Sequence, residues 1–423
     1  AVAYPYAGNI GGGGFMVYRK ANGETGSLDY REKAPMKATK NMYLDQAGNV
    51  IPNLSVDGAM AIGVPGTVAG VFAVHQKFGK LPMTEILTPI IDLAKRGVVI
   101  TPYQQKQLDK WRPDIVKISG KETLFAKPFK AGDTVKYPAL AETLSRIMTN
   151  GAAEFYQGET AQKIVAFVQR NGGILTLEDL KNYEVKWRET VTFPYKNLKI
   201  ISMAPPSSGG LTLQQIMKMI EPYPLAKYGH NSEKAIQIIV EAERRAYADR
   251  NFFLGDPDFV QIPKNKLVEK NYLKQRMKNF SWTKATPSAQ VSHGNITISE
   301  SHETTHYSIV DAFGNAVAAT TTLNGAFGSK LYSDELGFFF NNQMDDFSVK
   351  PGVPNSYGLV GAEANSIAPG KRMLSSMTPT IVEKDGKLFL ILGTPGGSTI
   401  ITSVLQTILN VSEFNMGVQQ AVN

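Results

Sequence analysis

Residues 304–323, TTHYSIVDAFGNAVAATTTL, carry the strongest local structural signal in the chain. β-Branched and aromatic residues fill both halves of the stretch, and the turn formers of DAFGN, residues 311–315, separate them. This pattern predicts a strand, a tight turn and a second strand. A fold for this chain must therefore contain an antiparallel hairpin at this place.

The start of the predicted hairpin overlaps residues 302–306, HETTH, which match the H-E-x-x-H motif of zinc proteases. A zinc site of that kind needs a helix that brings both imidazoles to one face, one turn apart. Strand-forming residues follow here instead, and Gly314 comes soon after them. An extended chain would place Thr304, His306 and Ser308 on one side of a strand. The sequence therefore predicts no metal site.

Residues 284–300, KATPSAQVSHGNITISE, are polar, lack an apolar period and predict an exposed linker. A hydroxyl at the start of a strand, directly after such a segment, suits self-cleavage. The Thr304 hydroxyl would attack the Glu303 carbonyl, an N-to-O acyl shift would give an ester, and water would release it. The new N-terminal threonine has an α-amine, of ordinary pKa ~8, that can serve as its general base. An ordinary Thr-Thr pair within a strand is the alternative interpretation.

Helices and strands are both expected elsewhere in the chain. Residues 81–97 predict a helix with Thr84 as N-cap and Gly97 as its end, and residues 232–259 predict a longer helix that ends in the turn formers GDPD. Residues 180–206 predict strands. Residues 386–398 predict a strand that ends in a glycine pair, and residues 399–414 a buried helix. The pattern indicates a mixed α and β protein.

Composition excludes several classes of protein. The chain has no cysteine, so thiol nucleophiles, thiolate metal sites and disulfides are absent. Its longest apolar runs, such as residues 388–392, are far too short to span a membrane. Residues 1–303 carry a net charge of +11 and residues 304–423 a net charge of −3. The lysines are dispersed along amphipathic segments, which indicates a solvated face rather than a nucleic-acid-binding stripe.

Nine motifs together resemble the γ-glutamyltranspeptidases, a family of N-terminal-nucleophile hydrolases. The predicted hairpin resembles the start of the family's small subunit. The other eight motifs follow the family's order over nearly the whole chain: GNIGGGGFMVYRK, LDYREKAP, VPGTVAGV, PPSSGG, RRAYADRNFFLGDPDF, NNQMDDFSVKPGVPN, KRMLSSMTPTIV and GTPGGSTIITSVLQ.

The resemblance implies an α+β fold, a four-layer αββα sandwich made as one precursor and cut between Glu303 and Thr304. Residues 1–303 would form a large subunit, with residues 284–303 as its exposed linker, and residues 304–423 would form a small subunit. We expect the N-terminal part of the large subunit and the C-terminal part of the small subunit to lie outside this segment. The two subunits would pair as an αβ heterodimer.

The resemblance also implies roles for single residues. Thr304 matches the nucleophile, Thr322 the second threonine that orients it, and Gly396 and Gly397 the oxyanion-hole pair. The residues matching the γ-glutamyl pocket are Arg31, Ser375 and Ser376 for the α-carboxylate and Asn324, Gln343 and Asp346 for the α-amine. Residues 350–362 match a lid loop with Tyr357 as its gating aromatic. The tetraglycine 11–14 lacks the G-K-[ST] of a phosphate loop and is expected to permit close backbone packing.

The implied activity is transfer of a γ-glutamyl group from glutathione and related compounds, through an ester on Thr304, to water or to an amino acid or peptide. No metal, cofactor, nucleic-acid partner or membrane span is expected, and the family suggests a periplasmic or secreted location. Two alternatives remain. A cephalosporin acylase shares the fold but cleaves glutaryl groups without the α-amine, and a non-catalytic homologue would serve in surface binding.

Overall fold

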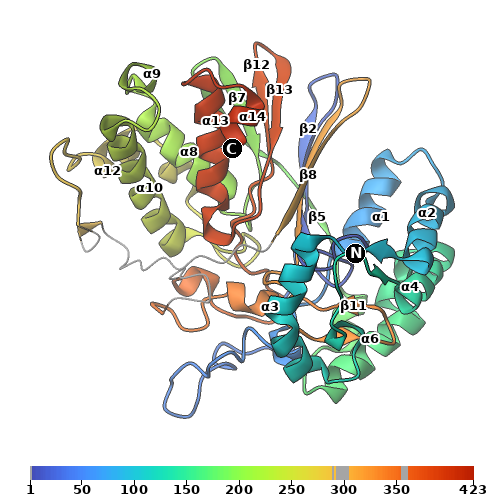
Figure 1. Ribbon diagram of the computed structural model, residues 1–423. Helices are drawn as coiled ribbons and strands as arrows, with labels where there is room; N and C mark the ends of the chain where they lie inside the picture. The colour runs from blue at the N-terminus through green and yellow to red at the C-terminus, as the bar shows by residue number, and fades with distance from the viewer. Residues whose placement is uncertain (1, 288–289, 292–303, 354–360) are drawn as a thin grey trace.

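The computed structural model describes residues 2–287, 290–291, 304–353 and 361–423. Two antiparallel sheets form its centre (Figure 1). The first has the strand order β5 (Lys186–Arg188), β2 (Thr25–Tyr30), β1 (Gly13–Arg19), β9 (Ala316–Thr322) and β8 (Thr305–Val310). The second has the order β13 (Lys387–Leu392), β12 (Thr380–Lys384), β7 (Leu198–Ser202) and β6 (Val191–Tyr195).

The two sheets pack face to face around a shared apolar cluster. Phe15 and Val17 of β1 and Ala316 and Ala318 of β9 belong to the same cluster as Ile381 of β12. All five side chains are almost fully buried, as expected for the inner faces of two stacked sheets. This packing brings β8 and β9 next to β12 and β13, so residues before and after these strands can meet.

Helices cover the outer face of the four-stranded sheet. α8 (Gly209–Ile220), α10 (Glu233–Phe253) and α13 (Ile400–Ser412) bury apolar side chains against it in the largest core cluster. Shorter helices surround them, namely α9 (Leu225–Tyr228), α11 (Lys264–Leu267), α12 (Lys270–Arg276) and α14 (Val418–Val422). The C-terminal end of α10 lies near the loops in the middle of the molecule (Figure 1).

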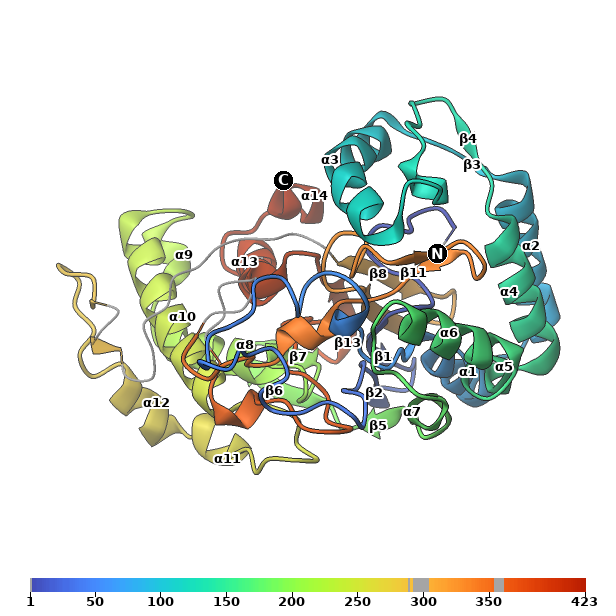
Figure 2. The same ribbon diagram turned by 90° about the horizontal axis from the view of Figure 1, so that it is seen from below.

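A second group of helices covers the five-stranded sheet (Figure 2). α1 (Thr67–Phe78) packs directly on β1 and β2. The others are α2 (Met83–Arg96), α3 (Pro102–Ser119), α4 (Pro138–Asn150), α5 (Ala152–Tyr156), α6 (Glu159–Arg170) and α7 (Leu177–Lys181). The short strand pairs β3 (Val98–Val99) with β4 (Thr134–Val135) and β10 (Tyr332–Ser333) with β11 (Phe338–Phe339) lie among them. Helix, sheet, sheet and helix form the four expected layers.

The predicted hairpin is confirmed as β8 and β9, paired from Thr305 opposite Thr321 to Val310 opposite Ala316. The second histidine of the H-E-x-x-H match, His306, therefore lies in a strand, and the helix that a zinc-protease site requires does not form there. His306 Nε2 lies 3.1 Å from Ser308 Oγ, as two residues on one side of a strand should.

Two local predictions need correction. Helix α2 begins at Met83 after Pro82, so Thr84 lies inside the helix and is not its N-cap, whereas Gly97 ends the helix as predicted. Most of the described linker is exposed as predicted, but Thr286 is buried and donates to both carboxylate oxygens of Glu241, with its N–H at 2.9 Å and its hydroxyl at 2.6 Å. A buried carboxylate needs such donors.

The tetraglycine lies where β1 meets β9. A Cβ atom on Gly12 would lie 2.0 Å from the Thr322 carbonyl oxygen, and one on Gly14 would lie 2.3 Å from that of Thr320. Neither glycine has a positive φ, so the space and not the backbone angle requires glycine. The prediction of close backbone packing is confirmed, and the packing holds β1 against the strand that carries Thr322.

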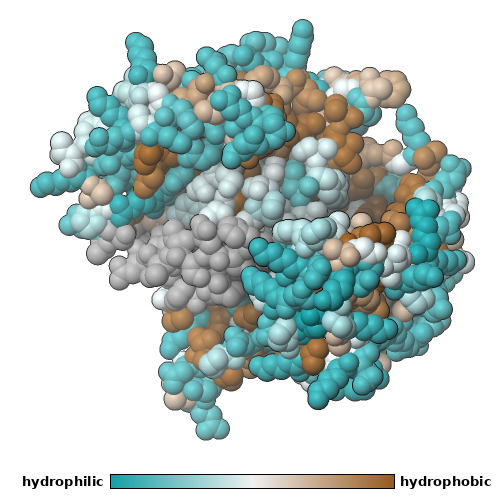
Figure 3. All heavy atoms as spheres, viewed as in Figure 1, coloured by the Kyte–Doolittle hydropathy of each residue, from teal (hydrophilic) through white to brown (hydrophobic). Residues whose placement is uncertain are grey.

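Hydrophilic side chains cover most of the outer helices, whereas hydrophobic ones gather over the upper ends of the sheets (Figure 3). Ile309 and Val310 of β8 are more than half exposed, because β8 is the outermost strand of its sheet in the described structure. None of the helices in the described residues has the length and apolar character needed to cross a membrane.

Candidate active site

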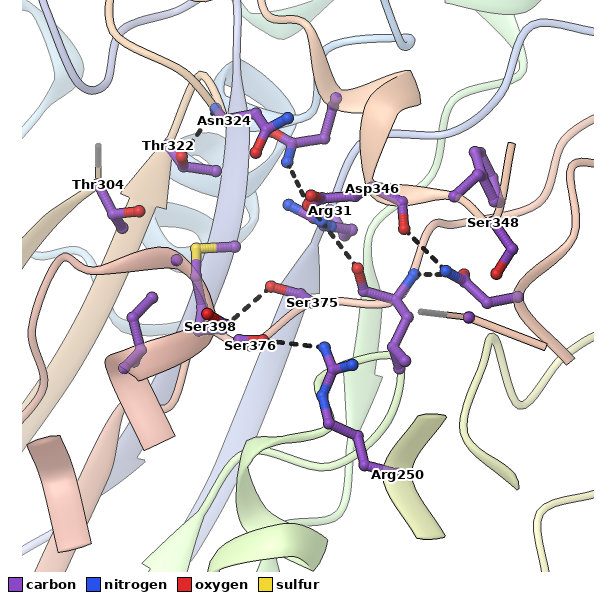
Figure 4. A pocket seen from close by; sticks show the side chains of 18 of the residues that line it. Arg31, Arg250, Thr304, Thr322, Asn324, Asp346, Ser348, Ser375, Ser376 and Ser398 are labelled. Carbon is purple, nitrogen blue, oxygen red and sulfur yellow. Dashed lines mark hydrogen bonds and ion pairs between the residues drawn. The ribbon is translucent and has the colours of Figure 1, made fainter. Parts of the chain in front are cut away.

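A pocket lies where the loops at the ends of β8, β9, β12 and β13 meet the end of α10 (Figure 4). Hydroxyl groups line one end of the pocket, and a buried arginine and a carboxylate line the other. Such a cavity, with few but convergent polar groups, is typical of a site for a small polar molecule.

Thr304 lies directly before β8 and lines the first end of the pocket. The register that pairs Thr305 with Thr321 continues to Thr304 opposite Thr322, which also lines the pocket. Thr322 Oγ1 accepts a hydrogen bond from the Asn324 N–H at 2.8 Å. Accepting this bond orients the Thr322 hydroxyl so that its own proton points away from Asn324.

The glycine pair that follows β13 forms a tight turn beside the threonines. Gly396 has φ 139° and Gly397 has φ 52°, backbone angles that residues with a Cβ atom rarely adopt. The Gly396 carbonyl accepts from the N–H of Thr399 at 3.0 Å and from its hydroxyl at 2.8 Å. This fixes the turn at the start of α13, and Gly397 lines the pocket.

Tyr247 of α10 holds the same turn from the other side. Its hydroxyl donates to the carbonyl oxygen of Ser398 at 2.6 Å, and Ser398 lines the pocket. Burial raises the pKa of Tyr247, so the phenol stays protonated and remains a donor. One helix of the first 303 residues thus fixes the glycine turn of the last 120.

Arg31 and Asp346 form an ion pair at the other end of the pocket. Arg31 is fully buried and also donates to the carbonyl oxygens of Met373 at 3.3 Å and Leu374 at 3.2 Å. Its own N–H donates to Asp29 Oδ1 at 2.9 Å. The guanidinium is therefore held in one position with its charge facing the pocket.

Two amides complete the charged end. Gln343 Nε2 donates to Asp346 Oδ2 at 2.8 Å, while Gln343 Oε1 is buried and has no hydrogen-bond partner among the described residues. Asn324 has φ 76°, and its Nδ2 donates to the Asn342 carbonyl at 3.0 Å. A buried amide oxygen without a donor is costly, which indicates that a ligand group supplies the missing hydrogen bond.

Ser375 and Ser376 lie between the two ends of the pocket (Figure 4). Ser375 Oγ accepts from the Met377 N–H at 3.1 Å, and Ser376 Oγ accepts from Arg250 Nη2 at 2.9 Å. Since each hydroxyl oxygen already accepts from the protein behind it, each hydroxyl proton is available to a group in the pocket.

His306 lies close to the pocket but is occupied in holding the sheets. Its Nδ1 lies 2.8 Å from Thr320 Oγ1, and a Cβ on Gly393 would lie 2.3 Å from the same nitrogen. Burial lowers the pKa of His306 to about 4, so the imidazole is neutral at pH 7. We assign it to the support of the strand that follows Thr304.

Most of the predicted site residues meet in this pocket. Those lining it are Arg31, Thr304, Thr322, Asn324, Gln343, Asp346, Ser375, Ser376 and Gly397, and Gly396 adjoins it. Glu303 and Tyr357 lie outside the described residues, as does most of the predicted lid at 350–362. The roles of all these residues remain predictions.

Sequence reasoning missed Arg250, Asn251 and Ser348, which also line the pocket. One signal was present for Arg250. It follows Ile239, Ala242 and Ala246 on the buried side of α10, where a further apolar residue would be expected. Ser348 and Asn251 gave no comparable signal, because polar residues in loops and at helix ends are common.

The four-layer αββα fold, with a threonine before a strand at the pocket, defines a hydrolase of the N-terminal-nucleophile type. The family model for Gamma-glutamyltranspeptidase matches residues 1–423, and the chain belongs to that family. It is 45% identical over 427 aligned positions to a glutathione hydrolase proenzyme of Escherichia coli, covering all of this chain and 74% of the relative.

Two solved structures are similar to this chain. The crystal structure of Helicobacter pylori γ-glutamyltranspeptidase has a TM-score of 0.65 and 46% sequence identity, over 67% of this chain and 82% of that one. A cephalosporin acylase from Bacillus halodurans has a TM-score of 0.82 over 99% of this chain and 75% of that one. Its identity is 21%, so this second likeness concerns the fold alone.

Proposed function

We propose that this protein is an autoprocessing γ-glutamyl transferase and hydrolase that cleaves the γ-glutamyl amide bond of glutathione and related compounds. The pairing of Arg31 with Asp346 in the pocket carries the proposal. A γ-glutamyl group ends in a zwitterion, with a carboxylate that needs a cation and an ammonium that needs an anion. A buried arginine beside a carboxylate offers both charges at one place.

Arg31, Ser375 and Ser376 bind the α-carboxylate in this proposal. Asp346, Asn324 and Gln343 receive the α-ammonium. The unpartnered Gln343 Oε1 supports this assignment, because an ammonium donor would satisfy it. By analogy with the family, Tyr357 is assigned the role of gating aromatic.

The reaction begins when Thr304 Oγ attacks the γ-carbonyl carbon of the donor. The α-amine of Thr304 takes the hydroxyl proton, and the N–H groups of Gly396 and Gly397 hold the oxyanion, each worth ~3 kcal/mol. The C–N bond then breaks, and the leaving amine takes the proton. Water or the amine of an amino acid or peptide attacks the ester, which restores Thr304. The Thr322 hydroxyl orients that of Thr304.

The α-amine exists only after the Glu303–Thr304 bond is cut, so self-cleavage precedes activity. Thr304 Oγ attacks the Glu303 carbonyl, and hydrolysis of the resulting ester gives a large subunit that ends at Glu303 and a small subunit that begins at Thr304. Contacts such as that between Tyr247 and Ser398 support a lasting αβ heterodimer. By analogy with the family, we place the reaction in the periplasm or outside the cell.

Donors with and without the α-amine test the proposal. We expect γ-glutamyl-p-nitroanilide to be cleaved, and an added dipeptide to accelerate the release of p-nitroaniline. Glutaryl-p-nitroanilide lacks the amine and should be a much poorer donor. Equal use of both donors would favour the acylase alternative, and no cleavage of either donor by processed protein would favour a non-catalytic binding role.

Neighbouring carboxylates provide a matched pair of variants. Asp346→Asn removes the charge facing the ammonium. It should lower kcat/KM for γ-glutamyl donors about tenfold more than kcat/KM for glutaryl donors. Asp345 is more deeply buried than Asp346, accepts from Ser55 Oγ at 2.7 Å and does not line the pocket. Asp345→Asn should leave the ratio between the two donors unchanged. A ratio unaffected by Asp346→Asn would contradict the assigned amine contact.

A further inference from the structure

Arg250 reaches the pocket from the C-terminal end of α10 (Figure 4). Its side chain lines the pocket and the residue is only 4% exposed. Nε donates to Ser208 Oγ at 2.8 Å, Nη1 to Asn251 Oδ1 at 3.0 Å and Nη2 to Ser376 Oγ at 2.9 Å. All three partners are neutral.

The absence of a carboxylate partner separates Arg250 from the other deeply buried arginines. Arg31 pairs with Asp346, Arg245 with Glu241 and Arg372 with Asp29. Throughout the described residues, Arg250 forms no ion pair, and burial lowers the pKa of its guanidinium against the smaller opposing effects of Tyr247 and the Asp346 carboxylate. A buried charge without a counter-ion is strongly unfavourable, so such a group beside a ligand pocket indicates an anion in the ligand.

The hydrogen bonds of Arg250 also set the direction of the serine hydroxyls. Because Ser376 Oγ accepts from Arg250, its proton is left to donate into the pocket. Ser208 accepts from Arg250 and donates to the Ser375 carbonyl at 2.7 Å. Arg250 therefore supports both members of the serine pair, one directly and one through Ser208.

Asn251 adds an independent observation. Its Oδ1 is occupied by Arg250, whereas its Nδ2 is buried and has no hydrogen-bond partner within the part of the chain that the structure describes, and the residue lines the pocket. An unfilled donor beside an uncompensated cation is the arrangement that an anionic oxygen would complete.

We propose that Arg250 is a positioning residue of the α-carboxylate subsite, in which it supplies a second buried positive charge and fixes Ser376 as a hydrogen-bond donor. The proposal rests on the proposed function and extends it, since Arg31 was the one cation assigned to this carboxylate, beside Ser375 and Ser376. Arg250 acts mainly on donor binding, because its contacts lie on the Ser375–Ser376 side and not at the glycine turn.

Arg250→Met and Arg250→Lys test the proposal on the processed full-length protein. Steady-state kinetics with γ-glutamyl-p-nitroanilide should give a KM about tenfold to a hundredfold higher for Arg250→Met, with kcat within about threefold of wild type. Arg250→Lys keeps the charge but cannot donate to Ser208 and Ser376 at the same time. Its KM should therefore lie between those of wild type and Arg250→Met. An unchanged KM in both variants would overturn the proposal.

A donor without the carboxylate charge separates this role from a general structural one. In the α-carboxamide analogue of γ-glutamyl-p-nitroanilide, the carboxylate is replaced by a neutral amide. Wild type should strongly prefer the acid, and Arg250→Met should reduce that preference about tenfold or more. Equal losses on both donors would assign Arg250 to structure alone.

Two controls keep the outcomes distinct. The extent of cleavage and the melting temperature of each variant report folding, and Arg250→Lys replaces Arg250→Met if the latter fails to fold. Lack of activity in wild type would defeat the proposed function itself. Wild-type activity together with an intact acid preference in the Arg250 variants would defeat only the role of Arg250.

Discussion

Replacing Glu32 by glutamine tests the electrostatics beneath the pocket. Glu32 is fully buried, and neither carboxyl oxygen has a hydrogen-bond partner in any other residue that the structure describes. Arg31 Nη1 lies 3.6 Å from Oε2, which is too long for a hydrogen bond. Burial raises the pKa of Glu32 to about 8, against the opposing effect of Arg31. The carboxyl is therefore protonated in the folded protein at neutral pH.

The size and sign of the effect follow from this pKa. A rise in the pKa of Glu32 from 4.5 to about 8, at ~1.4 kcal/mol per pKa unit, changes the free energy of unfolding by at most about 5 kcal/mol between low and high pH. Between these two pH values the folded protein binds this proton and the unfolded chain does not. The free energy of unfolding should therefore fall as pH rises through that window and level off above about pH 8.

Urea unfolding at pH 5, 7 and 9 measures the effect. A Thr304→Ala background keeps every sample a single chain. Glu32→Gln mimics the neutral carboxyl, so the variant should match its parent near pH 5 and become progressively more stable than it toward pH 9. A variant less stable than its parent at pH 9, or a difference independent of pH, would show that Glu32 is a charged partner of Arg31.

Glu241→Gln is the matched control with the opposite sign. Glu241 is also buried, but hydrogen bonds from Thr286 and Arg245 outweigh burial and lower its pKa. Its stabilisation is therefore present above about pH 4.5 and lost as pH falls through its folded pKa. Glutamine at 241 should destabilise the protein at pH 7 and pH 9, where glutamine at 32 stabilises it.

Three further results are expected. Thr304→Ala should abolish both cleavage and transfer, and two subunits on a denaturing gel would contradict its role. Tyr247→Phe removes the hydrogen bond to Ser398 and should lower kcat about fivefold, with KM unchanged, since one such bond is worth ~1 kcal/mol. A change confined to KM would contradict the role of Tyr247 in supporting the glycine turn. Treatment with EDTA should leave the rate of p-nitroaniline release unchanged, and a loss reversed by added metal would revive the zinc interpretation.

Local sequence patterns were sufficient for elements with strong periodicity and clear ends. The hairpin β8–β9, the helix α10 and the strand β13 lie where apolar spacing and turn formers indicated. Weaker signals failed at the boundary of α2, where Pro82 and not Thr84 caps the helix. Thr286 is buried because Glu241 and Arg245 surround it, and they come from a helix that local polarity cannot reveal.

The assembled pocket could not be predicted from local patterns. Arg31, Thr304, Asp346 and Ser375 come from separate stretches, and only the stacking of two sheets brings them together. Family resemblance, and not periodicity, selected these residues. Arg250 was not selected in this way, because the role proposed for it depends on the absence of an ion pair among the described residues, which is a property of the folded protein.

The central claim is that Thr304 becomes an N-terminal nucleophile. Intact mass spectrometry of the purified full-length protein, with N-terminal sequencing of any smaller fragment, tests it most directly. We expect two chains, the smaller beginning Thr-Thr-His-Tyr-Ser, and a γ-glutamyl adduct on that chain after brief exposure to donor. A single uncut chain that still releases p-nitroaniline, or an adduct on the larger chain, would contradict it.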